Sequence, residues 1–238
     1  METAADSMIL TPESLAAMID HTFLRAYGTP EEIETLCREA SEYRFAMVAV
    51  NPAEVARCVK LLAGSGVRVG AAVGFPLGQN TSQTKAFETR DALEKGAGEI
   101  DTVLNLRALQ SGCLDVVRRE IRDLVALTRP AGVISKVILE TCYLSDEQKR
   151  TACRIALEEG VDYVKTSTGM GKSGATVADV RLMRSVVGDR VRIKAAGGIR
   201  NLESVKALIA AGASRLGTSS GVAIVEELRA QLRLAFTS

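Results

Sequence analysis

Residues 160–169, GVDYVKTSTG, contain in ten residues the unit from which most of the chain is built. Gly160 follows a long amphipathic segment, and an apolar run with β-branched residues begins directly after it. A glycine commonly follows the last turn of a helix, and such apolar runs are typical of buried strands. The stretch therefore predicts a helix followed by a strand, and it places Lys165 on that strand. Because burial of an ammonium group is costly, its presence there has to be explained by a chemical role.

The same spacing recurs elsewhere in the chain. Gly96 precedes Asp101 by five residues and Gly212 precedes Gly217 by five, as Gly160 precedes Lys165. Each glycine is predicted to end a helix, so that each following strand starts in the same phase.

Apolar runs alternate along the whole chain with longer segments of helical period. The helices are predicted to start at Thr29, Asn51, Ser145, Thr176 and Asn201, each a capping residue. Strands are predicted at 19–24, 45–50, 68–75, 99–105, 135–141, 163–168, 191–197 and 215–220. Eight such units predict an α/β fold, a (β/α)8 TIM barrel of one domain over residues 1–238, with an extra N-terminal helix near Pro12 to Met18. An open doubly wound sheet is the alternative.

The charge balance favours a small-molecule partner. Thirty basic and twenty-nine acidic residues give a net charge of +1, without the basic cluster that a nucleic-acid or anionic-membrane partner requires. No apolar run approaches the ~18 residues of a membrane span, and the N-terminus does not resemble a secretory signal. We expect a cytoplasmic enzyme that binds neither nucleic acid nor membrane.

Metal and nucleotide chemistry find little support. His21 is the single histidine, and as a neighbour of Asp20 it is predicted to be a structural hydrogen-bonding residue. The five cysteines lack CxxC spacing, which indicates reduced thiols and no zinc site. Neither a GxGxxG nor a GxxxxGK[ST] motif is present, so the sequence predicts no metal and no cofactor.

Three predicted strands carry charged residues near their C-terminal ends, which form the active-site face of a barrel: Asp101, Lys165 and Lys194. The two lysines lie on neighbouring strands. At ~5.5 Å and an effective dielectric constant of ~20 they repel by roughly 3 kcal/mol, about 2 units in pKa, and burial acts in the same direction. A lysine with such a lowered pKa attacks carbonyl carbons to form a Schiff base, and Asp101 is a candidate for proton transfer.

Two glycine-containing loops follow the last two predicted strands. KAAGGIRN (194–201) contains Gly197 and Gly198, and GTSSG (217–221) contains Ser219 and Ser220. Glycines let backbone amides approach an anion, and a helix N-terminus favours negative charge. The two loops together predict a phosphate-binding site, although a glycine turn and a serine cap would give the same pattern.

The chain resembles the deoxyribose-phosphate aldolase family in a series of motifs that cover nearly its whole length. They are IDHT (19–22), VNP (50–52), VGFPLG (73–78), TKAFE (84–88), EIDTVLN (99–105), KVILET (136–141), DYVKTSTG (162–169), SGAT (173–176), KAAGGIR (194–200) and GTSSGVAI (217–224).

The resemblance implies a cofactor-free class I aldolase that reversibly cleaves 2-deoxy-D-ribose 5-phosphate to acetaldehyde and D-glyceraldehyde 3-phosphate, and it implies a homo-oligomer, a dimer. It assigns the Schiff base to Lys165, proton relay to Asp101 and Lys194, and phosphate binding to the two loops. The remaining candidates are Thr168 and Lys172 for substrate or phosphate binding, and Lys136 and Asp20 as supporting residues. Met170 stands where some members have a phosphate-contacting lysine, and Lys172 follows two residues later.

Two alternatives remain open. One is another Schiff-base barrel, such as a transaldolase-like enzyme or a class I hexose-phosphate aldolase. The other is a barrel that binds a sugar phosphate without catalysis, which the lysine pair disfavours because a binding protein has no use for that repulsion.

Overall fold

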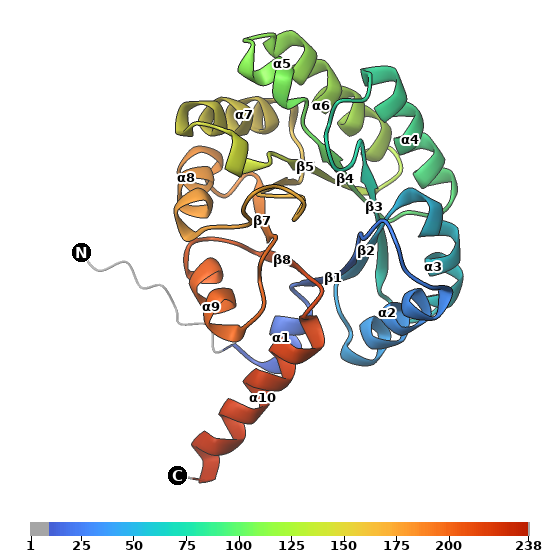
Figure 1. Cartoon of the computed structure of the whole chain (residues 1–238), viewed down its shortest axis with the longest axis vertical. Coiled ribbons are helices and arrows are strands. Elements are labelled where there is room, and N and C mark those ends of the chain that lie inside the picture. The colour runs from blue at the N-terminus through green and yellow to red at the C-terminus, as the bar shows by residue number, and fades with distance from the viewer. Residues whose placement is uncertain (1–9, 238) are drawn as a thin grey trace, which may run out of the picture.

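Eight parallel strands form a closed barrel in the computed structural model, which describes residues 10–237 and the side chains of residues 10–235 (Figure 1). Each strand pairs with the next, and β8 pairs with β1 to close the barrel. The strands are β1 Ile19–Phe23, β2 Met47–Val50, β3 Arg68–Val73, β4 Glu99–Val103, β5 Ile134–Ile138, β6 Tyr163–Lys165, β7 Arg192–Ala196 and β8 Arg215–Thr218. The predicted TIM barrel is confirmed, and the open sheet is excluded.

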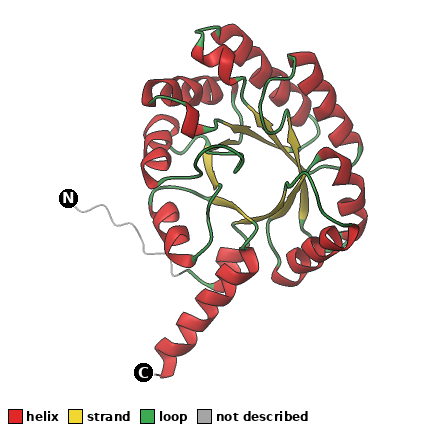
Figure 2. Ribbon diagram, viewed as in Figure 1, coloured by secondary structure: helices red, strands yellow, loops and turns green. Residues whose placement is uncertain are grey.

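Helices surround the strands on the outside (Figure 2). They are α1 Pro12–Ala16, α2 Pro30–Tyr43, α3 Val55–Leu61, α4 Ser82–Glu94, α5 Leu106–Gln110, α6 Leu114–Thr128, α7 Asp146–Glu159, α8 Val177–Val187, α9 Leu202–Ala210 and α10 Gly221–Thr237, with 3-10 turns at Pro52–Glu54 and Thr141–Tyr143. The predicted extra N-terminal helix is α1, which packs against α10 and ends two residues earlier than expected.

Local sequence sets the ends of these helices. The hydroxyl of Ser145 accepts the backbone N–H of Gln148, whose side chain accepts the N–H of Ser145, which is the predicted capping box of α7. The same helix ends at Gly160, whose φ of 75° lies in the left-handed region. Asn51 differs from the prediction, because Pro52 first opens a 3-10 turn and α3 starts only at Val55.

Successive side chains of each strand point alternately towards the surrounding helices and into the barrel, which separates an apolar layer from a polar interior. Ile100 on β4 and Val164 on β6 belong to the apolar core under the helices. Their neighbours on the strand point the other way, into the barrel. Barrel interiors are usually filled by branched apolar side chains, whereas here the inward positions include Glu99, Asp101 and Lys165.

Two further sequence predictions concern the whole chain. The extent of the domain, residues 1–238, stays a prediction, because residues 1–9 and Ser238 lie outside the described part. Within residues 10–237, none of the helices has the length and apolar character needed to cross a bilayer.

One close backbone contact joins the loop after β6 to the loop after β7. The N–H of Ala175 donates to the carbonyl groups of Ala196 and Gly197, each at 3.1 Å. A Cβ atom on Gly174 would lie 2.0 Å from the carbonyl oxygen of Gly197, so only glycine allows this approach.

We therefore expect Gly174→Ala to lower the free energy of unfolding by about 1–3 kcal/mol, the usual cost of a forced clash in a packed region. The measurement is urea unfolding followed by circular dichroism. Gly98→Ala is the matched control, because its Cβ would meet Arg68 at an ordinary 3.5 Å. Equal stability of the two variants would contradict the importance of this contact.

Candidate active site

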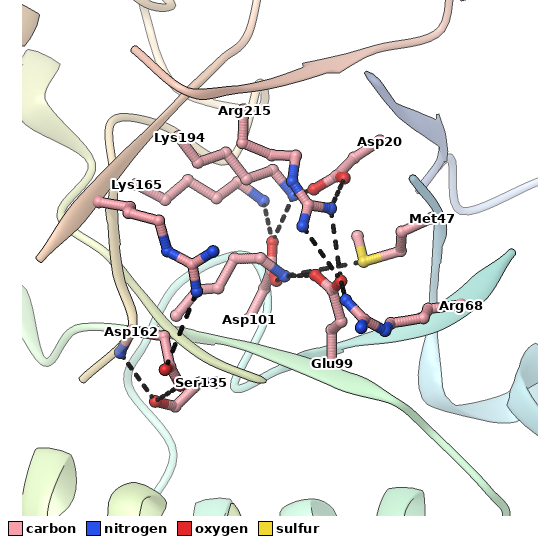
Figure 3. Close-up of polar contacts among 12 residues, drawn as sticks. Asp20, Met47, Arg68, Glu99, Asp101, Ser135, Asp162, Lys165, Lys194 and Arg215 are labelled. Atoms are coloured by element: carbon pink, nitrogen blue, oxygen red, sulfur yellow. Dashed lines mark hydrogen bonds and ion pairs between the residues drawn. The ribbon is translucent and has the colours of Figure 1, made fainter. Parts of the chain in front are cut away.

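The interior of the barrel holds a cluster of buried ionisable side chains (Figure 3). Three are acids and four are bases: Asp20, Glu99, Asp101, Lys136, Lys165, Lys194 and Arg215. Burial of a net charge is costly, so the way in which these groups pair determines which of them stay ionised.

Asp101 is the centre of this cluster. Its Oδ1 lies 2.7 Å from Nζ of Lys136, and its Oδ2 lies 2.8 Å from Nζ of Lys165 and 2.7 Å from Nζ of Lys194. Strand register brings them together, because Asp101 pairs with Lys136 across β4 and β5, and Lys165 with Lys194 across β6 and β7. Burial alone would raise the pKa of Asp101, but the three ammonium groups hold it well below its usual range.

Three bases of this cluster, Lys136, Lys194 and Arg215, each have two carboxylate partners within it. Lys136 contacts Glu99 as well as Asp101. Lys194 reaches Asp20 at 2.5 Å in addition to Asp101. Arg215 contacts Asp20 at 2.6 Å and Glu99 at 3.3 Å.

Lys165 has a single carboxylate partner among the described residues, and it shares that oxygen with Lys194. Burial lowers the pKa of Lys165 to about 8; Asp101 opposes this shift and the charge of Lys194 adds to it. If Lys165 loses its proton, the three acids of the cluster face its three remaining bases, and the largely exposed Arg68 approaches Glu99 from outside the cluster at 3.4 Å. The repulsion predicted from the sequence is present, but burial is the larger cause, and the Asp101 carboxylate bridges the two lysines.

Gly217 on β8 gives the side chain of Lys194 the space to reach these carboxylates. A Cβ atom at Gly217 would lie 3.1 Å from Cε of Lys194 and 2.9 Å from Cβ of Ala196. The glycine of the GTSSG motif therefore serves the lysine network as well as the loop that follows it.

A cavity of about 700 Å³ opens at the C-terminal end of the barrel, a usual size for a small-molecule site. Lys165 is the one lysine among its described lining residues; Lys136, Lys194 and Asp101 lie behind it. The partly neutral amine is thus the one that faces incoming molecules.

The predicted phosphate-binding residues lie partly on this cavity. Gly197, Gly198 and Ser219 line it, as does Thr168. Ser220 and Lys172 are not on the described lining, and Nζ of Lys172 lies 5.6 Å from the centre of the Tyr143 ring instead.

The structure adds residues that the sequence predictions missed. Arg200 lines the cavity beside the two glycines and has no carboxylate within salt-bridge distance in the described part of the chain. Its position in the KAAGGIR motif was a signal that could have revealed it. The hydroxyl of Thr218 joins the two loops, since it donates to the carbonyl of Ile199 at 2.7 Å and accepts the N–H of Ser220 at 2.9 Å.

His21 also lines the cavity, as does Glu39, a carboxylate oxygen of which lies 2.7 Å from Nε2 of His21; the His21 ring packs against Phe45. Residues 10–235 contain no group of three or more His, Cys, Asp or Glu side chains placed to hold a metal ion.

The environment of Lys165 predicts a pH dependence. Imine formation with acetaldehyde, trapped by borohydride, is expected to rise with pH through about 8, because the neutral amine is the nucleophile. Lys194→Met removes one repelling charge and leaves Asp101 Oδ2 to Lys165 alone, so the midpoint should move to higher pH. Lys172→Met is the control and should leave it unchanged. An unmoved midpoint in Lys194→Met would contradict the coupling of the two lysines.

Comparison with known proteins agrees with this geometry. A family model described as DeoC/LacD family aldolase matches residues 14–227. A deoxyribose-phosphate aldolase of Bacteroides thetaiotaomicron is 68% identical over 217 residues, 91% of each chain, and one of Caldanaerobacter subterraneus is 53% identical over 219 residues, 92% of this chain and 95% of its own. The solved structure of a tetrameric deoxyribose phosphate aldolase from Aeropyrum pernix superposes with a TM-score of 0.87 at 34% identity, covering 93% of both chains. The chain therefore belongs to the DeoC/LacD family of aldolases.

Proposed function

We propose that the protein is a deoxyribose-phosphate aldolase that cleaves 2-deoxy-D-ribose 5-phosphate to acetaldehyde and D-glyceraldehyde 3-phosphate through a Schiff base on Lys165. The observation that carries this proposal is the position of Lys165. Within the interior cluster it is the base with a single carboxylate partner, its pKa is lowered to about 8, and it lines the cavity.

In this mechanism the neutral amine of Lys165 adds to the aldehyde carbon C1 of the open-chain sugar, and water leaves to give a protonated imine. The electron pair of the C2–C3 bond then moves towards the imine to form an enamine, while the C3 hydroxyl loses its proton and becomes the aldehyde of glyceraldehyde 3-phosphate. Protonation of the enamine at C2 and hydrolysis release acetaldehyde and restore the amine.

We assign the proton transfers to Lys194 and the electrostatic support to Asp101. A carboxylate whose pKa is held well below its usual range is a weak base, so Asp101 remains ionised and holds the ammonium groups in place. Lys194 protonates the departing hydroxyl at imine formation, and its free amine then accepts the proton of the C3 hydroxyl. Lys136 and Asp20 support this pair, since each binds one of its members.

The phosphate group is proposed to bind at the loops after β7 and β8. Gly197 and Gly198 expose backbone there with positive φ, Ser219 offers a hydroxyl group, and Arg200 brings a positive charge. The hydroxyl of Thr218 already donates to Ile199, so the donors to the phosphate come from its neighbours.

The names of the two relatives from Bacteroides thetaiotaomicron and Caldanaerobacter subterraneus favour this substrate over a hexose phosphate. We also propose that the protein assembles with its own copies as a dimer, which light scattering in solution tests, and that it works in the cytoplasm. The five free cysteines support that location, which fractionation of the cells tests.

Borohydride trapping in the presence of acetaldehyde, followed by peptide mass mapping, is expected to place the adduct on Lys165. Lys165→Met should abolish cleavage of deoxyribose 5-phosphate and should also remove the adduct, while circular dichroism confirms an intact fold. A label on Lys194 or Lys136 in the native protein would overturn the assignment of roles.

Ser219→Glu tests the phosphate site. The added carboxylate repels a phosphate dianion but not a neutral sugar, so kcat/KM for deoxyribose 5-phosphate should fall at least about tenfold more than kcat/KM for deoxyribose. Ser214→Glu, at an exposed position outside the cavity lining, is the control. Equal losses on both substrates in Ser219→Glu would place the phosphate elsewhere.

A further inference from the structure

Glu140, directly after β5, is a buried carboxylate with an unusual environment. The residue is 2% exposed, and no lysine or arginine of residues 10–235 is within salt-bridge distance of its carboxylate. Its φ of 50° lies in the left-handed region, which is unfavourable for a residue with a side chain. A buried acid on strained backbone, without a cation, indicates a specific task.

Both oxygens of Glu140 face Thr168 on the cavity wall, and Oε1 also lies 3.9 Å from Sγ of Cys142. The backbone N–H of Thr168 donates to them at 3.3 and 3.4 Å, and the hydroxyl of Thr168 donates to Oε2. The same hydroxyl oxygen accepts the N–H of Met170 at 2.9 Å. Glu140 therefore fixes the position of Thr168 and the direction in which its hydroxyl proton points.

The remaining hydrogen-bonding capacity of Thr168 follows by counting. A hydroxyl group has one proton and two lone pairs. Glu140 takes the proton and Met170 occupies one lone pair, which leaves one lone pair on a residue that lines the cavity. Towards the substrate, Thr168 is an acceptor and cannot be a donor.

Thr168 also lies between the two ends of the proposed substrate. It comes three residues after Lys165. A Cβ atom added to the next residue, Gly169, would lie 3.7 Å from Cα of Gly197, which belongs to the proposed phosphate site. A sugar held by an imine at one end and by its phosphate at the other therefore passes Thr168 with its middle carbons.

We propose that Glu140 is a positioning residue that makes Thr168 a fixed hydrogen-bond acceptor for the C4 hydroxyl of the substrate, the hydroxyl that glyceraldehyde 3-phosphate retains. This inference rests on the proposed function. The C3 hydroxyl must lose its proton during cleavage, whereas the C4 hydroxyl keeps its proton throughout and needs an acceptor. Glu140 thereby selects substrates that carry this hydroxyl.

The test compares kcat/KM for 2-deoxyribose 5-phosphate with kcat/KM for 2,4-dideoxypentose 5-phosphate, which lacks only the C4 hydroxyl; both release acetaldehyde. In Glu140→Gln the amide N–H₂ can face Thr168, and the freed hydroxyl proton can turn to the cavity. We expect the preference for the 4-hydroxylated substrate to fall by roughly tenfold, the worth of one hydrogen bond in selectivity. A variant with weaker cleavage of both substrates and an unchanged preference would overturn the proposal.

Glu88→Gln is the matched control. Glu88 also holds a loop, since it accepts the N–H of Gly74 at 2.7 Å and the amide of Asn80 at 2.8 Å, but it is not among the cavity residues. Its substitution should leave the preference unchanged, and a fall as large as in Glu140→Gln would overturn the proposal.

A second pair of variants keeps the proposal testable even if Glu140→Gln fails to fold. Thr168→Ser retains the hydroxyl and should retain the preference, whereas Thr168→Val should lose it. Trapping of acetaldehyde on Lys165 should persist in both, because acetaldehyde has no hydroxyl. A native enzyme that fails to cleave 2-deoxyribose 5-phosphate would refute the proposed function, whereas native cleavage with a preference that survives Thr168→Val would refute this inference alone.

Discussion

Asp101 accepts hydrogen bonds from three ammonium groups inside a closed barrel, and the chemistry of the site depends on this shared carboxylate. It holds Lys165 beside Lys194 in spite of their repulsion, and the three ammonium groups keep its pKa well below the usual range. Three of the four buried bases in this cluster each contact two acids, whereas one contacts a single acid. That base is Lys165, which is also the lysine that lines the cavity. The base with the fewest acid partners is therefore the one that a substrate can reach.

The fold tolerates such an interior because the barrel does not rely on it for its apolar core. Outward-facing residues such as Ile100 and Val164 pack under the helices, and that layer removes apolar surface from water. The inward positions are therefore free to carry charge. Small residues on the same face, such as Gly217, leave the space that long lysine side chains need.

Much of the fold could be predicted from the sequence, because its signals are local. Capping residues such as Ser145 and the stop at Gly160 need only a few neighbours to act, and β-branched runs mark the strands. The pairing of Lys165 with Lys194 could also be predicted from the sequence. The recurring spacing between a helix-ending glycine and the next strand indicates how adjacent strands align. Glu99 was also within reach: it alternates with Asp101 on one strand, so both point inward.

Other features of the site depend on contacts that no short pattern encodes. Glu140 acts through a left-handed backbone and a loop 28 residues away. Lys172 carries the right charge near the right motif, yet its side chain lies over Tyr143, because the loop turns away from the cavity after Met170. The sequence also could not show that burial lowers the pKa of Lys165 more than the charge of Lys194 does. Burial and the bridging Asp101 carboxylate exist only in the closed barrel.

The ion pairs of the interior also bear on how the chain folds. Asp20 and Arg215 are 195 residues apart in sequence, and Asp101 and Lys194 are 93 apart. Non-local contacts of this kind form late, since long loops must close first. A partly assembled barrel therefore keeps its charged face in water, and only when β8 meets β1 do all the charges find partners. The buried charges thus disfavour early collapse of the interior and favour complete closure of the barrel.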